Sequence, residues 1–379
     1  MQMTICNNHS CTGCGLCAAQ CPVSCITMKA GKLGHLFPKI DNNKCIHCGL
    51  CRKKCPALNP TEMHTPKHAY AAWAKDEKDY RSSTSGGASS VIAQHIINQG
   101  GVVYGCAVLP GAIVEHIRID EKEDLYRIKG SKYVQSSIVN VLPQIKQDIK
   151  ENRKVLFLGT PCQIAAVKKL FTDIPNNLYL VDLVCHGTPS QKSLHNYLQR
   201  HVPLNIIDGI SFRSEDGYRI KAFCGNQILY SSPELLTCRY KDYYYNAFID
   251  GYSFRDSCYQ CKYANPKRCS DITIGDFWGL GKESPGDDIP EHNFGISLML
   301  PITTKGQILF NKIVERMEVK ERPLSEAING NGQLQHPIEK SRKVFFYRFL
   351  QPILGDKNSY VLVMKVTKVC SLCYKILKK

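Results

Sequence analysis

The sequence predicts an α+β fold in which a mixed α/β core domain follows a small cysteine-dense domain. Ten of the twenty cysteines fall within residues 1–58, which lack the long periodic apolar runs of an ordinary core. From Tyr70 onward, apolar runs of strand length alternate with helix-like stretches. With 379 residues, 43% of them hydrophobic, the chain is long enough to bury a sizeable core.

These patterns divide the chain into four parts. We expect a small domain at 1–58, a proline-containing linker at 59–66, a core domain at 67–335 and a basic tail at 336–379. Core strands are expected at 101–109, 154–158, 178–184 and 271–274, and helices at 88–98, 138–150, 161–171, 189–200 and 306–317. Because strands and helices are mixed along the chain, the core has α/β or α+β architecture.

The pentapeptide Gly-Thr-Pro-x-Gln occurs twice, at 159–163 and at 187–191. In each copy the Thr suits the N-cap of a helix, the Pro suits the first helical position and the Gln completes a capping box. Two strand–turn–helix units in tandem predict neighbouring parallel strands, whose carboxyl ends carry Cys162 and Cys185. We therefore expect a site at that edge of the sheet.

The cysteines of the small domain form one motif twice: Cys11-x-x-Cys14-x-x-Cys17-x-x-x-Cys21-Pro22 and Cys45-x-x-Cys48-x-x-Cys51-x-x-x-Cys55-Pro56. Three thiolates at this spacing bind three irons of one [4Fe-4S] cluster, and the fourth reaches the other cluster. The expected ligands are Cys11, Cys14, Cys17 and Cys55 for one cluster, and Cys45, Cys48, Cys51 and Cys21 for the other. Zinc is the alternative, but structural zinc sites seldom use this arrangement twice. Cys6 and Cys25 fall outside the motif and are expected to be bystanders.

The core holds four further candidate thiols, Cys162, Cys185, Cys258 and Cys261, which would suffice for a third [4Fe-4S] cluster. The residues alone leave other interpretations open. A single cysteine near a strand end is usually a small buried hydrophobe. A Cys-x-x-Cys pair far from other motifs is also found as half of a zinc site or as a redox disulfide.

Two segments suit a phosphate group: Ser85-Gly86-Gly87, just before an expected helix, and the basic turn Lys129-Gly130-Ser131-Lys132-Tyr133. Backbone N–H groups at a helix start, with ammonium groups nearby, bind pyrophosphate. As isolated patterns both are weak, because Gly-Gly before a helix is more often a plain turn. Asp276 and Trp278 lie in a third candidate segment, 271–279, where the Trp either covers a planar ring or, as we favour, belongs to the core.

The formal net charge of +16 requires a partner of opposite sign. Residues 340–379 hold ten Lys or Arg against one acid, Asp356, so part of the excess lies in one tail rather than in a stripe suited to nucleic acid. Basic and apolar residues alternate along 342–354, which suits either an anionic membrane surface or a helix packed on the body. No apolar run reaches 18 residues, and no signal-peptide pattern opens the chain, so we expect a cytoplasmic protein, either free or peripheral to the inner face of the membrane.

Together these segments resemble the coenzyme F420 hydrogenase/dehydrogenase beta-subunit family, which includes 7-hydroxymethyl chlorophyll a reductase. The matching segments run in the family's order over residues 67–300, after a ferredoxin segment that many members carry. They are 85–88, 130–133, 159–163, 182–187, 211–213, 257–261 and 270–278. The basic tail with Cys370 and Cys373 has no counterpart in the family, and Cys269 is a spare thiol.

The resemblance implies an FAD-containing core with its own [4Fe-4S] cluster on Cys162, Cys185, Cys258 and Cys261. It also implies that the loop at 85–87 and the turn at 129–133 lie against the FAD. Flavin lets one-electron clusters exchange with a two-electron substrate. His186 and Asp276 lie on motif segments, but neither is identifiable as a proton donor.

The implied function is that of an iron–sulfur flavoprotein oxidoreductase. Electrons would pass from a low-potential carrier such as ferredoxin through the clusters to FAD and a small organic substrate. An oxidoreductase acting on the deazaflavin coenzyme F420 is the alternative, and an iron–sulfur nucleic-acid-binding protein is a remote one, so nucleic acid is not expected as a partner. Similar sequences in bacteria that lack this coenzyme often lie beside genes for surface polysaccharide synthesis.

Overall fold

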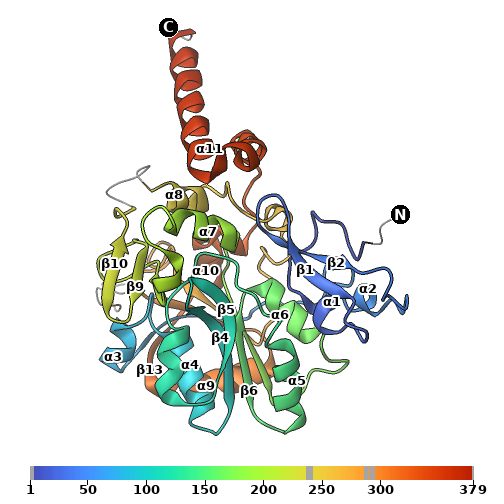
Figure 1. The fold of residues 1–379 in the computed structure, drawn as a ribbon. Helices are drawn as coiled ribbons and strands as arrows, with labels where there is room; N and C mark the ends of the chain where they lie inside the picture. Colours follow the sequence, from blue (N-terminus) through green and yellow to red (C-terminus); the bar gives the residue numbers. More distant parts are fainter. Residues whose placement is uncertain (1–3, 236–241, 286–288, 290–294, 378–379) are drawn as a thin grey trace.

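The computed structural model describes residues 4–235, 242–285, 289 and 295–377, with side chains up to residue 366 (Figure 1). Within these residues, eight strands form one mixed sheet in the order β13-β3-β12-β11-β7-β6-β4-β5. The strands are β3 (Ala69–Ala74), β4 (Val102–Leu109), β5 (Ile113–Ile119), β6 (Val155–Gly159), β7 (Leu178–Leu183), β11 (Ile272–Asp276), β12 (Ser297–Pro301) and β13 (Met317–Arg322). The central pairs β4–β6, β6–β7 and β7–β11 are parallel, and the outer pairs are antiparallel.

Helices cover both faces of this sheet, because alternate strand residues point to opposite sides. On one face, Val103, Leu156 and Met299 pack against α4 (Ala88–Ile97) and α9 (Thr304–Ile313). On the other face, Tyr104 and Phe157 pack against α5 (Leu142–Lys150) and α6 (Pro161–Lys168). The parallel strands are therefore buried on both sides, and their carboxyl ends are the part of the sheet left for a site.

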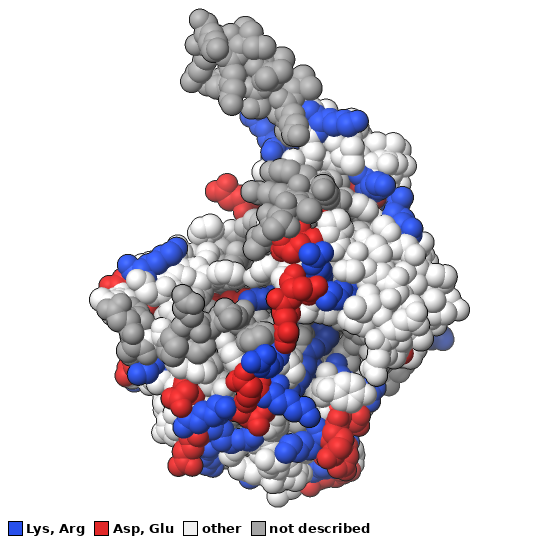
Figure 2. Space-filling view, turned by 90° about the vertical axis from the view of Figure 1, so that its left-hand side faces the viewer, with Lys and Arg blue, Asp and Glu red and all other residues white. Residues whose placement is uncertain are grey.

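A second unit packs beside the main sheet (Figure 1). It consists of the antiparallel strands β8 (Gly209–Ser211), β9 (Lys221–Cys224) and β10 (Gln227–Ser231), with the helices α7 (Gln191–Leu198), α8 (Tyr243–Ile249) and the first part of α11 (Arg342–Leu377). Smaller helices are α3 (Glu77–Arg81) and α10 (Leu324–Gly330). On the side that bears α3 and β9–β10, basic side chains are interspersed with acidic ones rather than forming a continuous basic stripe (Figure 2).

The N-terminal domain is a pseudo-symmetric pair of short elements. Strands β1 (Ile26–Ala30) and β2 (Leu36–Ile40) are antiparallel, and each of the helices α1 (Leu16–Ala19) and α2 (Leu50–Lys53) follows a glycine in the left-handed region. Few apolar side chains are buried inside the domain, where thiols take their place. Such a small unit gains its stability from what the thiols bind.

Most predicted elements of the core are confirmed. All four predicted strands occur within two residues of their expected bounds, and β6 and β7 are neighbouring parallel strands as the repeated pentapeptide predicts. The first copy forms the capping box of Thr160 and Gln163. The second copy does not, because Ser190 is the N-cap of α7 and Gln191 instead accepts from the backbone N–H of Val114 at 2.8 Å.

Backbone contacts with residues distant in sequence explain why the second pentapeptide copy lacks the capping box. The backbone of Pro189 forms an isolated bridge with Phe254, and its carbonyl accepts from the N–H of Gln135 at 3.0 Å. These contacts hold the segment extended after β7, so the helix begins two residues later than the local pattern predicts. The helix expected at 306–317 likewise ends at Ile313, because Met317 opens the edge strand β13.

A buried ion pair fixes the carboxyl end of β7. Asp182 is fully buried and accepts from the guanidinium of Arg268 at 2.5 Å, from Ser270 at 2.9 Å and from Thr273 at 2.5 Å. Arg268 also donates to the carbonyl of Tyr263 at 2.7 Å. The network ties β7 to β11 and to the segment that follows Cys261.

We expect the substitution Asp182→Asn to lower the free energy of unfolding by about 3–5 kcal/mol, because it leaves the charge of Arg268 buried without a partner. Chemical denaturation followed by circular dichroism measures this change. The matched control is Glu77→Gln, which breaks the exposed pair of Glu77 and Arg81 and is expected to cost less than about 0.5 kcal/mol. Equal losses in the two variants would contradict this role for Asp182.

Candidate functional site

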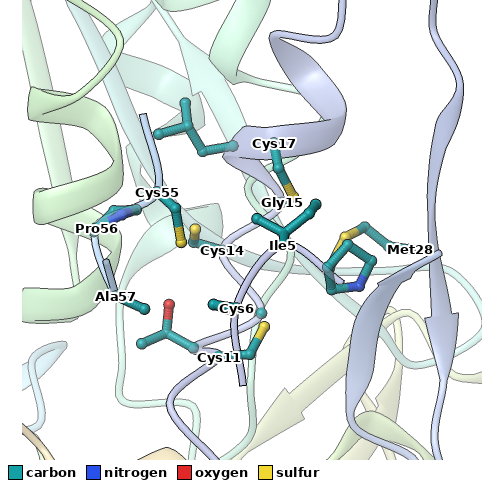
Figure 3. Close-up of a pocket in the computed structure, with 14 residues that line it drawn as sticks. Ile5, Cys6, Cys11, Cys14, Gly15, Cys17, Met28, Cys55, Pro56 and Ala57 are labelled. Atoms are coloured by element: carbon teal, nitrogen blue, oxygen red, sulfur yellow. The ribbon is translucent and has the colours of Figure 1, made fainter. Parts of the chain in front are cut away.

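The cysteines of the N-terminal domain line two separate cavities. One cavity is lined by what we call the inner cysteine set, Cys11, Cys14, Cys17 and Cys55 (Figure 3). The other is lined by the outer cysteine set, Cys21, Cys45, Cys48 and Cys51. Each set combines three thiols of one motif copy with the fourth of the other copy. This grouping fits two clusters of the [4Fe-4S] type, each needing four thiolates.

Each cavity also holds a fifth thiol that the motif does not include. Cys6 lines the inner cavity and Cys25 the outer one, where its Sγ lies 3.4 Å from the Sγ of Cys21. Hydrogen bonds from Cys6 lower the pKa of Cys11 to about 7 and that of Cys55 to about 6. Hydrogen bonding from Cys6 therefore favours the thiolate form of Cys11 and Cys55, the form that binds iron.

The core cysteine set, Cys162, Cys185, Cys258 and Cys261, comes from three segments. The capping box opens α6 at the carboxyl end of β6 and thereby positions Cys162 in the first helical turn. Cys185 follows the adjacent parallel strand β7. The 3₁₀ helix Asp256–Gln260 contributes Cys258, and Cys261 follows it directly.

These four thiols lie close enough to affect one another. Burial raises the pKa of Cys162, and the negative charges of Cys261, Cys185 and Cys258 raise it further. Burial likewise raises the pKa of Cys185 to about 12. Among the described residues, no three Cys, His, Asp or Glu side chains are close enough to bind a single metal ion. A [4Fe-4S] cluster does not require its ligands to meet at a single metal ion, because each of its four thiolates binds a different iron.

The inner cysteine set faces the core cysteine set. Cys14 packs against the same buried cluster of side chains as Cys162, Cys261 and Tyr263, and Leu16 is fully buried there. In Figure 1 the N-terminal domain lies beside α6 accordingly. In the outer set Cys48 is exposed, whereas Cys11 of the inner set is buried. The three sets therefore run in a series from the surface to the core.

Arg255 lies between the inner and core sets. Its side chain is 1% exposed, and it donates to the backbone carbonyls of Cys11 at 2.9 Å and of Leu36. A Cβ at Gly13 would clash with its guanidinium, so this position needs glycine. Within the described residues no carboxylate pairs with it. Burial lowers the pKa of Arg255, whereas the thiols of Cys11 and Cys258 raise it when they are ionised. A buried cation of this kind requires anions nearby, and the cysteine sets are the groups that can supply them.

The two phosphate-type segments lie side by side. Thr84 and Ser131 are 3.1 Å apart between their hydroxyl oxygens. Gly87 is the N-cap of α4 with φ 85°, and a Cβ at Gly86 would clash with the carbonyl oxygen of Ala72, so both positions require glycine. The hydroxyl of Ser85 is buried, with no hydrogen-bond partner in the described part of the chain. An unpaired buried hydroxyl beside a helix start fits a ligand with phosphate oxygens.

The two lysines of the basic turn differ in their partners. Lys129 donates to Asp79 at 2.8 Å and to Ser82 at 2.7 Å, so its charge is already paired. Lys132 donates to the carbonyl of Lys129 at 2.5 Å, and in the described region no acid pairs with it. Burial lowers its pKa. Of the two, Lys132 is therefore the better candidate for an anionic ligand.

Two further predicted residues, Tyr133 and Asp276, contact side chains of neighbouring elements. Tyr133 stacks on Phe248 with ring centroids 4.6 Å apart, and Asp276 pairs with Arg213 at 2.8 Å. The guanidinium of Arg213 and the backbone of Ser85 both lie next to Gly295, so the Asp276 segment and the glycine loop approach the same glycine. Sequence reasoning noted Arg213 only as part of a matching segment and missed this role.

Trp278 corrects an expectation. Its side chain is 53% exposed, so it does not belong to the core as we favoured, whereas the preceding Phe277 is buried.

His186 is held by the carbonyl of Ile249 at 2.9 Å and by Gln333 at 2.9 Å, and burial lowers its pKa. It is thus a neutral structural partner. Cys269 is buried in the same apolar cluster as Cys162 and Cys261, where its thiol donates to the carbonyl of Pro161 at 3.6 Å, and the side chains of Cys370 and Cys373 lie outside the described residues.

Comparison with known proteins agrees with this arrangement. Residues 152–327 match the family model for the C terminus of the coenzyme F420 hydrogenase/dehydrogenase beta subunit. Residues 10–59 and, overlapping them, residues 41–108 match models of a 4Fe-4S dicluster domain. No curated protein matches the sequence. Among solved structures, the chain is similar to one from the F420-reducing [NiFe] hydrogenase complex of Methanosarcina barkeri. The two share 17% identity at a TM-score of 0.46, over 71% of this chain and 91% of that chain.

The matched regions occur in the order that the sequence motifs predict. The dicluster match covers both cysteine motifs of the N-terminal domain, and the beta-subunit match covers the whole core cysteine set. This chain is therefore an iron–sulfur oxidoreductase whose residues 152–327 match the C-terminal part of the coenzyme F420 hydrogenase/dehydrogenase beta-subunit family and whose residues 10–59 match a two-cluster [4Fe-4S] domain.

Proposed function

We propose that this oxidoreductase passes electrons from a low-potential carrier such as ferredoxin, through three [4Fe-4S] clusters, to FAD and a small organic substrate. The observation that carries the proposal is the buried cation of Arg255 between two cysteine sets, because it needs anionic groups on both sides. Residues 1–58 hold two clusters in this proposal, and residues 67–335 hold the third cluster and the flavin.

The order of the clusters follows from exposure. The outer cysteine set includes the exposed Cys48 and receives electrons from the carrier. The inner set passes them across the contact of Cys14 with Cys162 and Cys261 to the core set. Cluster potentials depend on charge, hydrogen bonds and exposure, so the fixed charge of Arg255 favours the reduced state of its two neighbouring clusters.

The flavin site in this proposal is the region where the glycine loop meets the basic turn. The N-terminus of α4, the hydroxyl of Ser85 and the ammonium of Lys132 would hold the pyrophosphate. Tyr133 and the pair of Asp276 and Arg213 would border the ring system. When bound, FAD supplies the exchange between one-electron clusters and a two-electron substrate. Trp278, being exposed, is available to cover a planar ring.

Coenzyme F420 is the second candidate substrate, because the family model that matches the core bears its name. Anaerobic assay of the purified protein with this coenzyme, followed by its absorbance, separates the two candidates. For the organic substrate we propose an intermediate of surface polysaccharide synthesis, which rests on the resemblance alone. Loss of a surface polysaccharide on deletion of the gene is the corresponding test.

The first prediction of this proposed function concerns cofactor content. Anaerobically purified protein is expected to contain about twelve irons, as much acid-labile sulfide and one FAD per chain. The variant Cys258→Ser is expected to retain about eight irons, because only the core cluster loses a ligand. Cys269→Ser is the matched control, since this buried thiol belongs to no set, and it should keep all twelve. Twelve irons in Cys258→Ser, or no flavin in the native protein, would contradict the assignment.

The second prediction concerns the charge of Arg255. The variant Arg255→Met is expected to lower the reduction potential of the inner cluster on the order of 50–100 mV, because a buried positive charge no longer stabilises the added electron. Arg255→Lys, which keeps the charge, is expected to restore most of the shift. The measurement is a potentiometric titration followed by electron paramagnetic resonance.

The outer cluster serves as the internal reference in that titration. Its potential is expected to change least, because Arg255 donates to the carbonyl of Cys11, an inner-set ligand, and contacts no cysteine of the outer set in the described structure. Equal shifts of all clusters, or none, would show that Arg255 acts only on the packing of the two domains.

A further inference from the structure

Helix α11 has one face that belongs to the core. Val344, Tyr347, Tyr360 and Val363 are buried against α7 and α8. The buried carboxylate of Asp356 accepts from the hydroxyl of Tyr347 at 2.9 Å and, across the interface, from Ser193 at 2.9 Å. This face is therefore fixed to the body of the protein.

The opposite face of α11 is exposed and apolar. Phe345, Phe349 and Ile353 follow one another at four-residue intervals and are 63%, 63% and 70% exposed. Phe346, at 56%, lies beside them. No other phenylalanine in the described part of the chain is exposed. Because positions four apart share one side of a helix, the three phenylalanines and Ile353 form a continuous apolar ridge.

Beyond this ridge the helix changes direction. Gly355 has φ 75° and Pro352 lies one turn before it, so α11 bends there. The second part begins against the body, where Tyr360 and Val363 are buried, and in Figure 1 it then projects from the body toward the C-terminus. Val361, Leu362 and Val366 on the second part are also exposed. No helix in the described ranges is long and apolar enough to span a bilayer.

Basic residues surround the exposed apolar side chains. Arg342 and Lys343 are exposed at the start of the helix, and Lys357 and Lys365 are exposed on the second part. Figure 2 shows Lys and Arg side chains gathered at the base of the projecting helix. Residues 340–379 hold ten basic residues against one acid, and that acid, Asp356, is buried. Lys340 and Arg348 pair with Asp256, so the described part of this surface combines exposed phenylalanines with the positive charges of Arg342, Lys343, Lys357 and Lys365.

The positive charge of this surface determines what kind of partner can bind to it. A second copy of the chain would bring a like-charged ridge to it, and repulsion would oppose the contact. An anionic lipid surface offers negative headgroups to the lysines and arginines and an apolar layer to the phenylalanines. We propose that the exposed face of α11 lies on an anionic membrane surface and holds the oxidoreductase there. This inference does not depend on the cofactors.

The test is flotation of the full-length holoprotein with vesicles of phosphatidylcholine, alone or mixed with phosphatidylglycerol. Binding is expected only with phosphatidylglycerol, and it should weaken as salt is added. The double variant Phe345→Ser/Phe349→Ser is expected to bind at least about tenfold more weakly. The double variant Arg342→Gln/Lys343→Gln is expected to lose about 30-fold, at about fivefold per charge.

A matched control removes two exposed apolar side chains elsewhere, Ile228 on β10 and Ile308 on α9, each 52% exposed. The variant Ile228→Ser/Ile308→Ser should bind as the native protein does. Iron content and the unfolding midpoint should stay unchanged in all variants, because none of the six side chains is buried. Equal binding to both vesicle types, absence of binding, or a dimer that depends on Phe345 and Phe349 would each overturn the proposal.

Discussion

The buried guanidinium of Arg255 is the interaction on which the arrangement of the two domains depends. Its guanidinium donates to two backbone carbonyls of the N-terminal domain and to the side chain of Gln135 in the core, and it lies over the ring of Phe37. These contacts satisfy its donors but not its charge. The charge is balanced only when the neighbouring thiols are ionised, which is the state that iron binding imposes. Docking of the domains and loading of the clusters are therefore coupled through one residue.

The parallel strands provide the other half of this arrangement. β6 and β7 end side by side, and the buried pair of Asp182 and Arg268 ties β7 to the segment that carries Cys261. The core cysteine set consequently lies at the carboxyl edge of the sheet, where parallel α/β sheets generally place their sites. The inner set reaches that edge from outside, so the site is completed by contact between the domains rather than within the sheet.

Much of the candidate site was predictable because its signals are local. The eight cysteines of the two N-terminal motifs occur at short, fixed spacings, and the capping box of Thr160 needs only four consecutive residues. The errors arose where distant residues decide. Ser190 displaced Thr188 as N-cap because Phe254 pairs with the preceding backbone, and Lys129 is paired with Asp79, fifty positions away. Arg255 had no local signal at all, since its importance comes from burial between two segments far from it in sequence.

The sequence pattern of α11 is ambiguous, and the structure shows that the helix has one buried face and one exposed face. Alternating basic and apolar residues suited either a packed helix or a membrane surface, and the helix has a face for each. Tyr347 and Asp356 face the body, whereas Phe345 and Phe349 face solvent. Deleting the helix would also remove buried side chains from the core, so a loss of lipid binding after deletion would not separate the two roles. Only substitutions on the exposed face, which leave the packing of Tyr347 intact, can assign the binding to that face.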